Sequence, residues 1–376
     1  MSIQTKASRG AQAAAKYLDV ADIAAIFRNQ GPAAVFSRLA DYIRDDYLRW
    51  DEFDKSSRVA KYSRLGVIEL MPIADSATYS FKCVNGHPHN IDRGLPTVMG
   101  FGALADVDTG AVQLISELTL TTALRTAATS ALFARVLARA DCRRMALIGN
   151  GAQADFQALA FHHLLGIDEI RLFDIDAAAT DKLMRNLRAS GIRFTVCDTA
   201  AEAVKGADIV TTVTAEHVHA QVLRAEMIEP GMHINAVGGD CPGKTELDPR
   251  ILHMGPVFVE YEPQTRVEGE LQNMPENFAA TPFWKVLHGL LPGRTDPGQI
   301  TIFDSVGFAL EDYSALRYVR DMAGKLGLGR ALTLVPRLDD PKDVFSLTRA
   351  GTEETRDAGE QGAAQPCEKE AMLPSA

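Results

Sequence analysis

The residues with the clearest chemical signature form a glycine-rich turn, Gly149-Asn150-Gly151-Ala152-Gln153-Ala154. It follows the apolar run 145–149 and precedes a segment with helical periodicity. In such a G-x-G-x-x-A turn the first glycine allows a tight bend, the second lets a pyrophosphate approach the backbone, and the third small residue lets helix and strand pack closely. The free N–H groups at the helix N-terminus then face the phosphates. The turn, with Gly149 at its bend, therefore predicts a dinucleotide site.

A carboxylate lies at the expected distance after this turn. Asp174 ends the next strand-like run, 170–174, where dinucleotide-binding folds place an acidic residue. A carboxylate can accept hydrogen bonds from the adenosine ribose hydroxyls and repels a 2′-phosphate, so NAD is predicted rather than NADP. The alternative is an ordinary turn with a surface aspartate.

Four charged residues stand in segments where a protein without a site would not need them. Lys82 and Glu69 each interrupt an apolar, strand-like run, and Arg58 precedes the run that holds Glu69. Arg125 lies among small apolar and hydroxyl residues, so its side chain must reach solvent or a charged partner. Its guanidinium suits bidentate binding of a carboxylate. Each residue taken alone is also explained as a solvent-facing side chain.

Asp240 follows the run HINAVGG, which is typical of a buried strand that ends in a Gly-Gly turn. Because ligands of parallel α/β sheets bind beyond the carboxyl ends of the strands, Asp240 is well placed to be a catalytic base. Lys244 comes four residues later. The alternative for Asp240 is a plain turn residue.

The histidines lack the spacing of a zinc site, so no metal is predicted. The chain also has no Walker loop and no G-x-S-x-G elbow. The residues together predict hydride transfer on a small zwitterionic substrate.

The elements that would carry these residues change in character along the chain. Residues 1–16 are expected to lack regular structure, and 33–53 have helical periodicity. Strand-like runs at 66–73, 78–85, 96–106 and 111–118 follow, with a hairpin turn predicted at 108–110. After about residue 126, strand-like and helix-like segments alternate, which indicates a mostly parallel sheet. The fold class predicted is α/β, with a Rossmann-type nucleotide domain beside an α+β domain.

Length and composition bound the function. A chain of 376 residues suits two domains, and its net charge of −10 argues against nucleic acid as a partner. The five cysteines form no CxxC pair, which fits a reducing compartment. Without a signal-peptide core or an apolar stretch of membrane-spanning length, we expect a cytoplasmic protein with no membrane partner.

The chain resembles the ornithine cyclodeaminase/μ-crystallin family from about residue 33 to 347, nearly its whole length. Of the matching segments, NAVGGDCPGKTEL is far more specific than the glycine-rich turn. The other matching segments are VIELMP, FKCVNGHP, TVMGFGALADVDTG, ISELTLTTALRTAATS, ALIGNGAQA, VFVEYEPQTRVEGE and IFDSVGFALEDY.

The resemblance implies roles at matching positions. Arg58, Lys82 and Arg125 match positions that hold the substrate α-carboxylate. Glu69 matches a position near the substrate amino groups, and Asp240 matches the catalytic acid/base. Asp174 matches the ribose-binding carboxylate. The other positions around the cofactor match Thr97, Asn150, Gly151, Ala152, Gln153, Lys244 and Ser305.

The resemblance also implies an activity and a domain plan. The activity is conversion of L-ornithine to L-proline and ammonia with NAD, with lysine cyclodeamination, another amino-acid dehydrogenase, a cyclic imine reductase or a non-catalytic binding protein as alternatives. Roles in proline biosynthesis and arginine catabolism are expected. A substrate-binding and dimerisation domain would span 1–126 with a return at 308–349, a Rossmann domain would span 127–307, and a disordered tail 350–376. A homodimer is implied.

Overall fold

The computed structural model describes residues 14–215 and 221–349. Of these, the residues up to Leu334 belong to one compact unit and those from Val335 to a second. The tail predicted from residue 350 lies outside the described residues. The first described element is β1 (Ala15–Leu18), which pairs with β7 and β16. The expectation that residues 15 and 16 lack regular structure was therefore wrong, because both edges of this short segment are paired.

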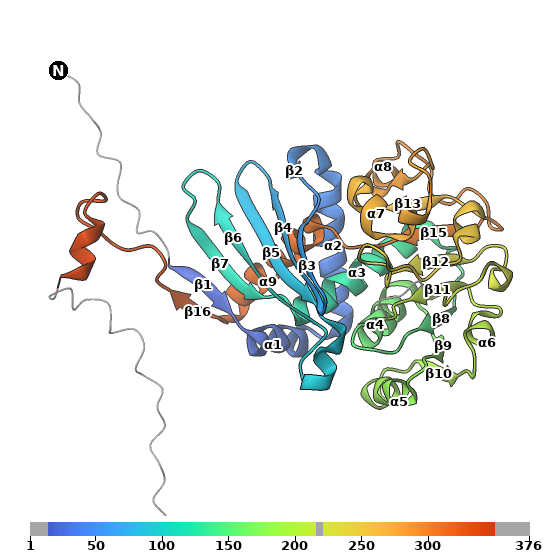
Figure 1. Cartoon of the computed structure of the whole chain (residues 1–376). Helices are drawn as coiled ribbons and strands as arrows, with labels where there is room; N and C mark the ends of the chain where they lie inside the picture. The colour runs from blue at the N-terminus through green and yellow to red at the C-terminus, as the bar shows by residue number, and fades with distance from the viewer. Residues whose placement is uncertain (1–13, 216–220, 350–376) are drawn as a thin grey trace, which may run out of the picture. The chain divides into compact units, whose positions relative to one another are not determined.

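The first sheet is mixed, with strand order β16-β1-β7-β6-β5-β4-β2 and β3 paired to β4 (Figure 1). Its central strands are antiparallel, and a tight turn joins β6 to β7, with Gly110 N–H donating to Asp106 O at 2.8 Å. This is the hairpin predicted at 108–110. The further strands are β2 (Asp54–Lys55), β3 (Val59–Ser63), β4 (Gly66–Ala74), β5 (Thr78–Gly86), β6 (Val98–Asp106), β7 (Val112–Glu117) and β16 (Arg330–Leu332).

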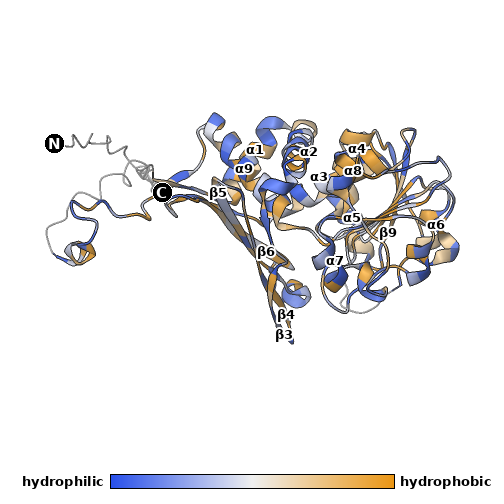
Figure 2. Ribbon diagram, turned by 90° about the horizontal axis from the view of Figure 1, so that it is seen from above, coloured by the Kyte–Doolittle hydropathy of each residue, from blue (hydrophilic) through white to orange (hydrophobic). Residues whose placement is uncertain are grey.

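Helices cover one face of this sheet (Figure 2). They are α1 (Val20–Gln30), α2 (Pro32–Leu48), α3 (Leu120–Leu137) and α9 (Ala309–Leu326). Helix α9 packs on β4, β5 and β6 although it follows the second sheet in the sequence. The described chain thus returns to its first sheet after completing the second, and the residues at the start of α9 meet the inner face of β5.

The second sheet is parallel throughout, with order β10-β9-β8-β11-β12-β15-β13-β14. The chain order reverses at β8, which is where ligands bind in such sheets. This confirms the predicted α/β class. The strands are β8 (Arg144–Ile148), β9 (Glu169–Phe173), β10 (Arg193–Val196), β11 (Ile209–Thr212), β12 (His233–Ala236), β13 (Val257–Val259), β14 (Thr281–Pro282) and β15 (Thr301–Asp304).

Short helices lie between these strands and elsewhere along the described chain. The α-helices are α4 (Ala154–Leu165), α5 (Ala177–Asn186), α6 (Ala200–Val204), α7 (Glu262–Glu268) and α8 (Phe283–Leu287). The 3-10 helices are η1 (Trp50–Glu52), η2 (Pro88–Arg93), η3 (Ala225–Met227), η4 (Pro249–His253), η5 (Glu270–Asn273) and η6 (Val344–Thr348). None of the helices in the described ranges is long and apolar enough to cross a membrane.

A stack of aromatic rings joins α3 to the second sheet. Phe133 is fully buried, and its ring centroid lies 3.4 Å from that of Phe283 and 3.8 Å from that of Phe303. The ring of Tyr47 contacts the Phe133 ring edge-on. Such rings bury a large apolar area and dominate core energetics. The domain boundary predicted at 126–127 falls inside α3, and the division into two domains stays a proposal.

Candidate active site

The glycine-rich turn lies between β8 and α4, at the point where the strand order reverses. Gly149 has φ of 94°, and a Cβ there would lie 2.8 Å from the carbonyl oxygen of Val213, so this position needs glycine. A Cβ added at Gly151 would meet no atom within 4 Å, so the space over the backbone is open at this position. Within the described residues the buried side-chain oxygens of Asn150 and Gln153 lack hydrogen-bond partners. These features fit a bound dinucleotide.

Asp174 directly follows β9 and accepts hydrogen bonds from the backbone N–H groups of Asn150 and Asp176. Its carboxylate is therefore held beside the turn, with lone pairs left for ribose hydroxyls. A hollow of about 260 Å³ begins next to it, at Phe173. The hollow is lined further by Thr199, Ala200, Ala201, Gln221, Val222, Arg224 and Met227. It offers room for an adenine ring.

Three other predicted cofactor residues have their contacts within the protein. The Ser305 hydroxyl donates to Glu260 at 2.7 Å, and the carbonyl of Thr97 accepts the His87 N–H at 2.9 Å. Lys244 bonds to Asp240. Their roles toward a cofactor stay predictions.

The register of β4 and β5 places Lys82 and Glu69 on the same, inner face of the first sheet. Glu69 pairs with Val84, and Lys82 pairs with Met71 two residues further along the ladder, so both side chains point to the same face. Both side chains are buried: Lys82 is 2% exposed and Glu69 is 6% exposed. The alternative that Lys82 is a solvent-facing lysine is therefore wrong.

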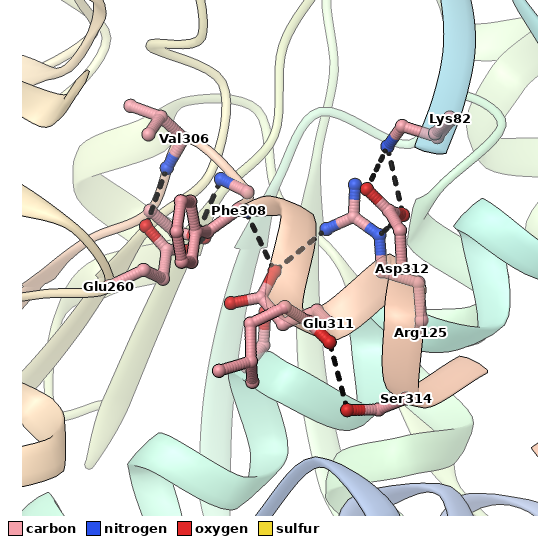
Figure 3. A network of polar contacts seen from close by, with 12 residues as sticks. Lys82, Arg125, Glu260, Val306, Phe308, Glu311, Asp312 and Ser314 are labelled. Carbon is pink, nitrogen blue, oxygen red and sulfur yellow. Dashed lines mark hydrogen bonds and ion pairs between the residues drawn. The ribbon is translucent and has the colours of Figure 1, made fainter. Parts of the chain in front are cut away.

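Lys82 and Arg125 meet at the start of α9 (Figure 3). Lys82 Nζ lies 2.9 Å from Asp312 Oδ1, and Arg125 lies 3.0 Å from Asp312 and 3.2 Å from Glu311. We call these two cations the Lys82–Arg125 clamp. Arg125 is placed by α3, whose first N–H groups are capped by the carboxylate of Glu117 at the end of β7.

Burial shifts the proton equilibria around the clamp. Desolvation, with the nearby Arg125 charge, lowers the pKa of Lys82 to about 8. Burial and the neighbouring Glu260 raise the pKa of Glu311 to about 8. The raised pKa favours the neutral form of Glu311 and so reduces the negative charge beside the two cations, while Asp312 stays paired with both. Two cations so close together can attract a substrate carboxylate.

Arg58 occupies a second, separate cluster. It pairs with Glu69 and with Glu268, each at 3.0 Å. Its remaining nitrogen donates to the carbonyl oxygens of Val306 and Gly307 at 2.6 and 2.7 Å. Arg58 thus bonds mainly to acidic groups here, and its role toward a substrate carboxylate stays a prediction. This cluster therefore contains more acidic than basic side chains.

Asp240 lies in the loop after β12, with its side chain 48% exposed and its Oδ1 3.0 Å from Lys244 Nζ. Lys244 is buried, and although burial opposes its charge, the carboxylates of Asp240 and Glu246 outweigh this and raise its pKa. A permanently charged lysine therefore holds Asp240 at the open side of the site.

Buried carboxylates brace the loops that carry Asp240 and Ser305. Glu246 accepts from the N–H of Gly238, Glu270 accepts from the N–H of Glu246, and Asp304 accepts from the N–H of Glu270. A Cβ at Gly238 would lie 2.2 Å from the Glu246 carboxylate, and one at Gly269 would lie 2.6 Å from that of Asp304. Glycine at these positions lets each carboxylate reach the backbone of the neighbouring loop.

Several of these acidic residues were not found from the sequence. Glu311 and Asp312 stand in the first turn of α9, where acidic residues are common for reasons of helix polarity alone. Glu268 neighbours Val267, which is 57% exposed, and so resembles a surface position. In the described part of the chain, no group of three His, Cys, Asp or Glu residues is arranged to hold a metal ion.

The arrangement has three parts with different chemistry. The turn at Gly149 can hold a dinucleotide, the Lys82–Arg125 clamp can hold a carboxylate, and the cluster of Glu69 and Glu268 can hold an ammonium group. Asp240 can exchange protons with a group between them.

Known proteins are similar to this chain over most of its length. The chain is 53% identical to an ornithine cyclodeaminase of Brucella melitensis over 84% of this chain and 88% of the relative. It is 54% identical to an ornithine cyclodeaminase of Agrobacterium fabrum over 82% and 88%.

Two solved structures are similar in fold. A lysine cyclodeaminase, described in terms of its recognition of L-lysine, L-ornithine and L-2,4-diaminobutyric acid, has a TM-score of 0.84 at 29% identity, covering 89% of this chain and 99% of the other. An archaeal alanine dehydrogenase dimer with bound NAD has a TM-score of 0.78 at 28% identity, covering 85% and 99%. The family model for ornithine cyclodeaminase and mu-crystallin matches residues 28–326. The chain is a member of the ornithine cyclodeaminase/mu-crystallin family.

Proposed function

We propose that this protein is an NAD-dependent ornithine cyclodeaminase, an ammonia-lyase that converts L-ornithine to L-proline and ammonia. The observation that carries this is the separation of charge in the site. Two cations, Lys82 and Arg125, form one group in the site, and the carboxylates of Glu69 and Glu268 form another around Arg58. A diamino acid carries one carboxylate and two ammonium groups and is complementary to both. The relatives at 53% and 54% identity support the assignment.

The chain's residues account for the steps of this reaction. When bound, NAD would accept a hydride from the substrate Cα and later return it. Lys82 and Arg125 hold the α-carboxylate and so fix the orientation of Cα. Asp240 takes a proton from the α-ammonium group, which leaves an iminium carbon once the hydride has moved. The distal amine attacks that carbon and closes a five-membered ring. Asp240 then returns its proton to the departing amino group, which leaves as ammonia, and the carbon of the cyclic imine that remains takes the hydride back to give proline.

Lysine cyclodeamination is the second candidate, since the same groups would serve a substrate with one more methylene. A pocket discriminates one methylene by only about 1–3 kcal/mol. The identity to ornithine cyclodeaminases over more than four-fifths of the chain favours ornithine.

Incubation of the purified protein with L-ornithine and a trace of NAD tests the function. We expect proline and ammonia in equal amounts, far exceeding the NAD supplied, without net NADH. L-lysine in parallel is the control for substrate choice. Faster pipecolate formation would change the substrate and keep the mechanism. NADH in proportion to the amino acid consumed, or no product, would contradict the proposal.

We also propose that the protein is a homodimer formed through the uncovered face of the first sheet. The outward side chains of β4, β5 and β6 are apolar, and Ile68, Tyr79 and Phe101 are 53%, 39% and 49% exposed. The rings of Tyr79, Phe81 and Phe101 contact one another there, and the patch includes a hollow of about 460 Å³. An apolar patch of this kind marks an interaction site. The archaeal alanine dehydrogenase, described as a dimer, supports this.

Replacing Ile68 by glutamate is expected to convert the dimer to a monomer, because a carboxylate would be buried unpaired in the interface. Light scattering after gel filtration measures the mass. Leu290→Glu is the matched control, since Leu290 is 63% exposed and lies away from this sheet. A dimer that survives Ile68→Glu would place the interface elsewhere.

The domain plan belongs to this proposal as well. Residues 1–126 with 308–349 would bind substrate and form the dimer, and 127–307 would bind NAD. We also propose a cytoplasmic location and a role in proline biosynthesis from arginine-derived ornithine.

A further inference from the structure

The proposed reaction needs two proton acceptors. The α-ammonium group must lose a proton before hydride can leave Cα, and the distal ammonium group must lose one before its nitrogen can attack the iminium carbon. Asp240 serves the first step. The second step requires another base on the side of the site away from the Lys82–Arg125 clamp.

Glu268 has the geometry of such a base. It is the last residue of α7 and is 3% exposed. Its Oε2 lies 3.0 Å from Arg58 Nε, yet within the described residues that oxygen accepts no hydrogen bond. Buried carboxylate oxygens are normally satisfied, and an unsatisfied one points to an absent partner. Glu69 Oε1 is also without a partner there, although Glu69 Oε2 bonds to Arg58.

The backbone holds Glu268 in place. The next residue, Gly269, donates its N–H to Thr265, and the following N–H groups of Glu270 and Leu271 are bound by Asp304. The carboxylate is therefore presented by a fixed segment, as proton transfer requires.

Resting on the function proposed above, we propose that Glu268 is a second catalytic base, which binds the distal ammonium group of the substrate and takes its proton for ring closure. The N–H bond breaks toward Glu268, the freed electron pair forms the bond from nitrogen to the iminium carbon, and the iminium electrons move to the α-nitrogen. Asp240 passes its proton to that nitrogen and takes the extra proton of the ring nitrogen, whose electron pair then expels ammonia. The cyclic iminium carbon takes the hydride back, and Asp240 and Glu268 return their protons to the ring nitrogen and to ammonia.

The charges around Glu268 suit this role. Burial raises the pKa of Glu268 to about 7, with Arg58 opposing the rise and Glu69 and Asp240 adding to it. Tyr62 and Cys241 are the other titratable neighbours, and their own pKa values are raised in part by Glu268. A base with a pKa near neutrality accepts a proton readily and releases it again in the same cycle. An arriving ammonium group would stabilise the ionised form.

The test uses Glu268→Gln, which keeps the shape and removes the negative charge. The NADH-loaded enzyme binds ligand without turnover, so calorimetry can compare L-ornithine with L-norvaline, which lacks the distal amine. We expect ornithine binding to weaken about ten- to a hundredfold while norvaline binding is unchanged. Equal losses for both ligands, or none, would overturn the proposal. Glu262→Gln, at the half-buried first position of α7 where the carboxylate pairs with Arg266, is the matched control.

Kinetics separate a base from a merely structural residue. With NAD and ornithine, Glu268→Gln should still transfer the first hydride and then stall, so absorbance at 340 nm should build up where the wild type shows none. Steady-state turnover should fall about 10²–10⁴-fold. A second measurement needs no variant: kcat/KM of the wild type should fall below about pH 7. A flat profile from pH 6 to 8 would overturn Glu268 as base, whereas absence of proline in the wild type would instead refute the proposed function.

Discussion

Asp240→Asn is expected to lower kcat by about 10³–10⁴-fold and to leave NAD binding unchanged. An amide has nearly the size of a carboxylate but cannot take the proton of the α-ammonium group, and loss of a general base typically costs 10²–10⁴-fold. Asp240 also returns this proton when ammonia leaves, so both half-reactions lose their catalyst. Because its side chain is 48% exposed, the fold should hardly be affected. Calorimetric NAD titration and single-turnover kinetics measure the two effects.

The variant must be compared with a neutral change of the same kind. Asp141→Asn removes a carboxylate that is 83% exposed, and should match the wild type in both measurements. Asp240→Asn also removes the ion pair with Lys244, whose ammonium group would then have Glu246 as the nearby carboxylate. If the variant turned over at even a tenth of the wild-type rate, Asp240 would not be the base, and Glu268 would be the first alternative to examine.

The sequence predicted the second sheet well because its signals are local. Buried parallel strands read as short apolar runs between glycines, and β8, β9, β11 and β12 lie within such runs. The turn at Gly149 follows from sterics within a few residues. The fold class needs no information from distant parts of the chain.

The partners of the charged residues were beyond sequence reasoning. Lys82 could be either a surface lysine or a ligand-binding one, and only burial against Asp312, 230 positions away, decides between them. Nothing in the residues next to Asp312 distinguishes it from an ordinary acidic residue in the first turn of a helix. Glu268 was hidden for the same reason, since its neighbours Val267 and Arg266 face outward or pair along the helix. Sites assembled from distant segments show their chemistry only after folding.

Lys82→Met is expected to raise KM for ornithine by about 10²-fold or more with a smaller effect on kcat. The change removes the charge-assisted hydrogen bond to the substrate carboxylate, and Arg125 alone would remain in the clamp. In the wild type the same contact should weaken above about pH 8, where Lys82 loses its proton, because burial has lowered its pKa to that value. The rise of KM with pH should be absent in the variant.

The variant also separates binding from stability. Without Lys82, the carboxylate of Asp312 remains buried with only Arg125 as partner, and removing one member of a buried ion pair costs about 3–5 kcal/mol of unfolding free energy. Replacing both, as Lys82→Met with Asp312→Asn, should restore most of that stability in urea unfolding but none of the substrate affinity. Lys61→Met, on the exposed strand β3, should change neither. Recovery of normal KM in the double variant would show that Lys82 serves the fold alone.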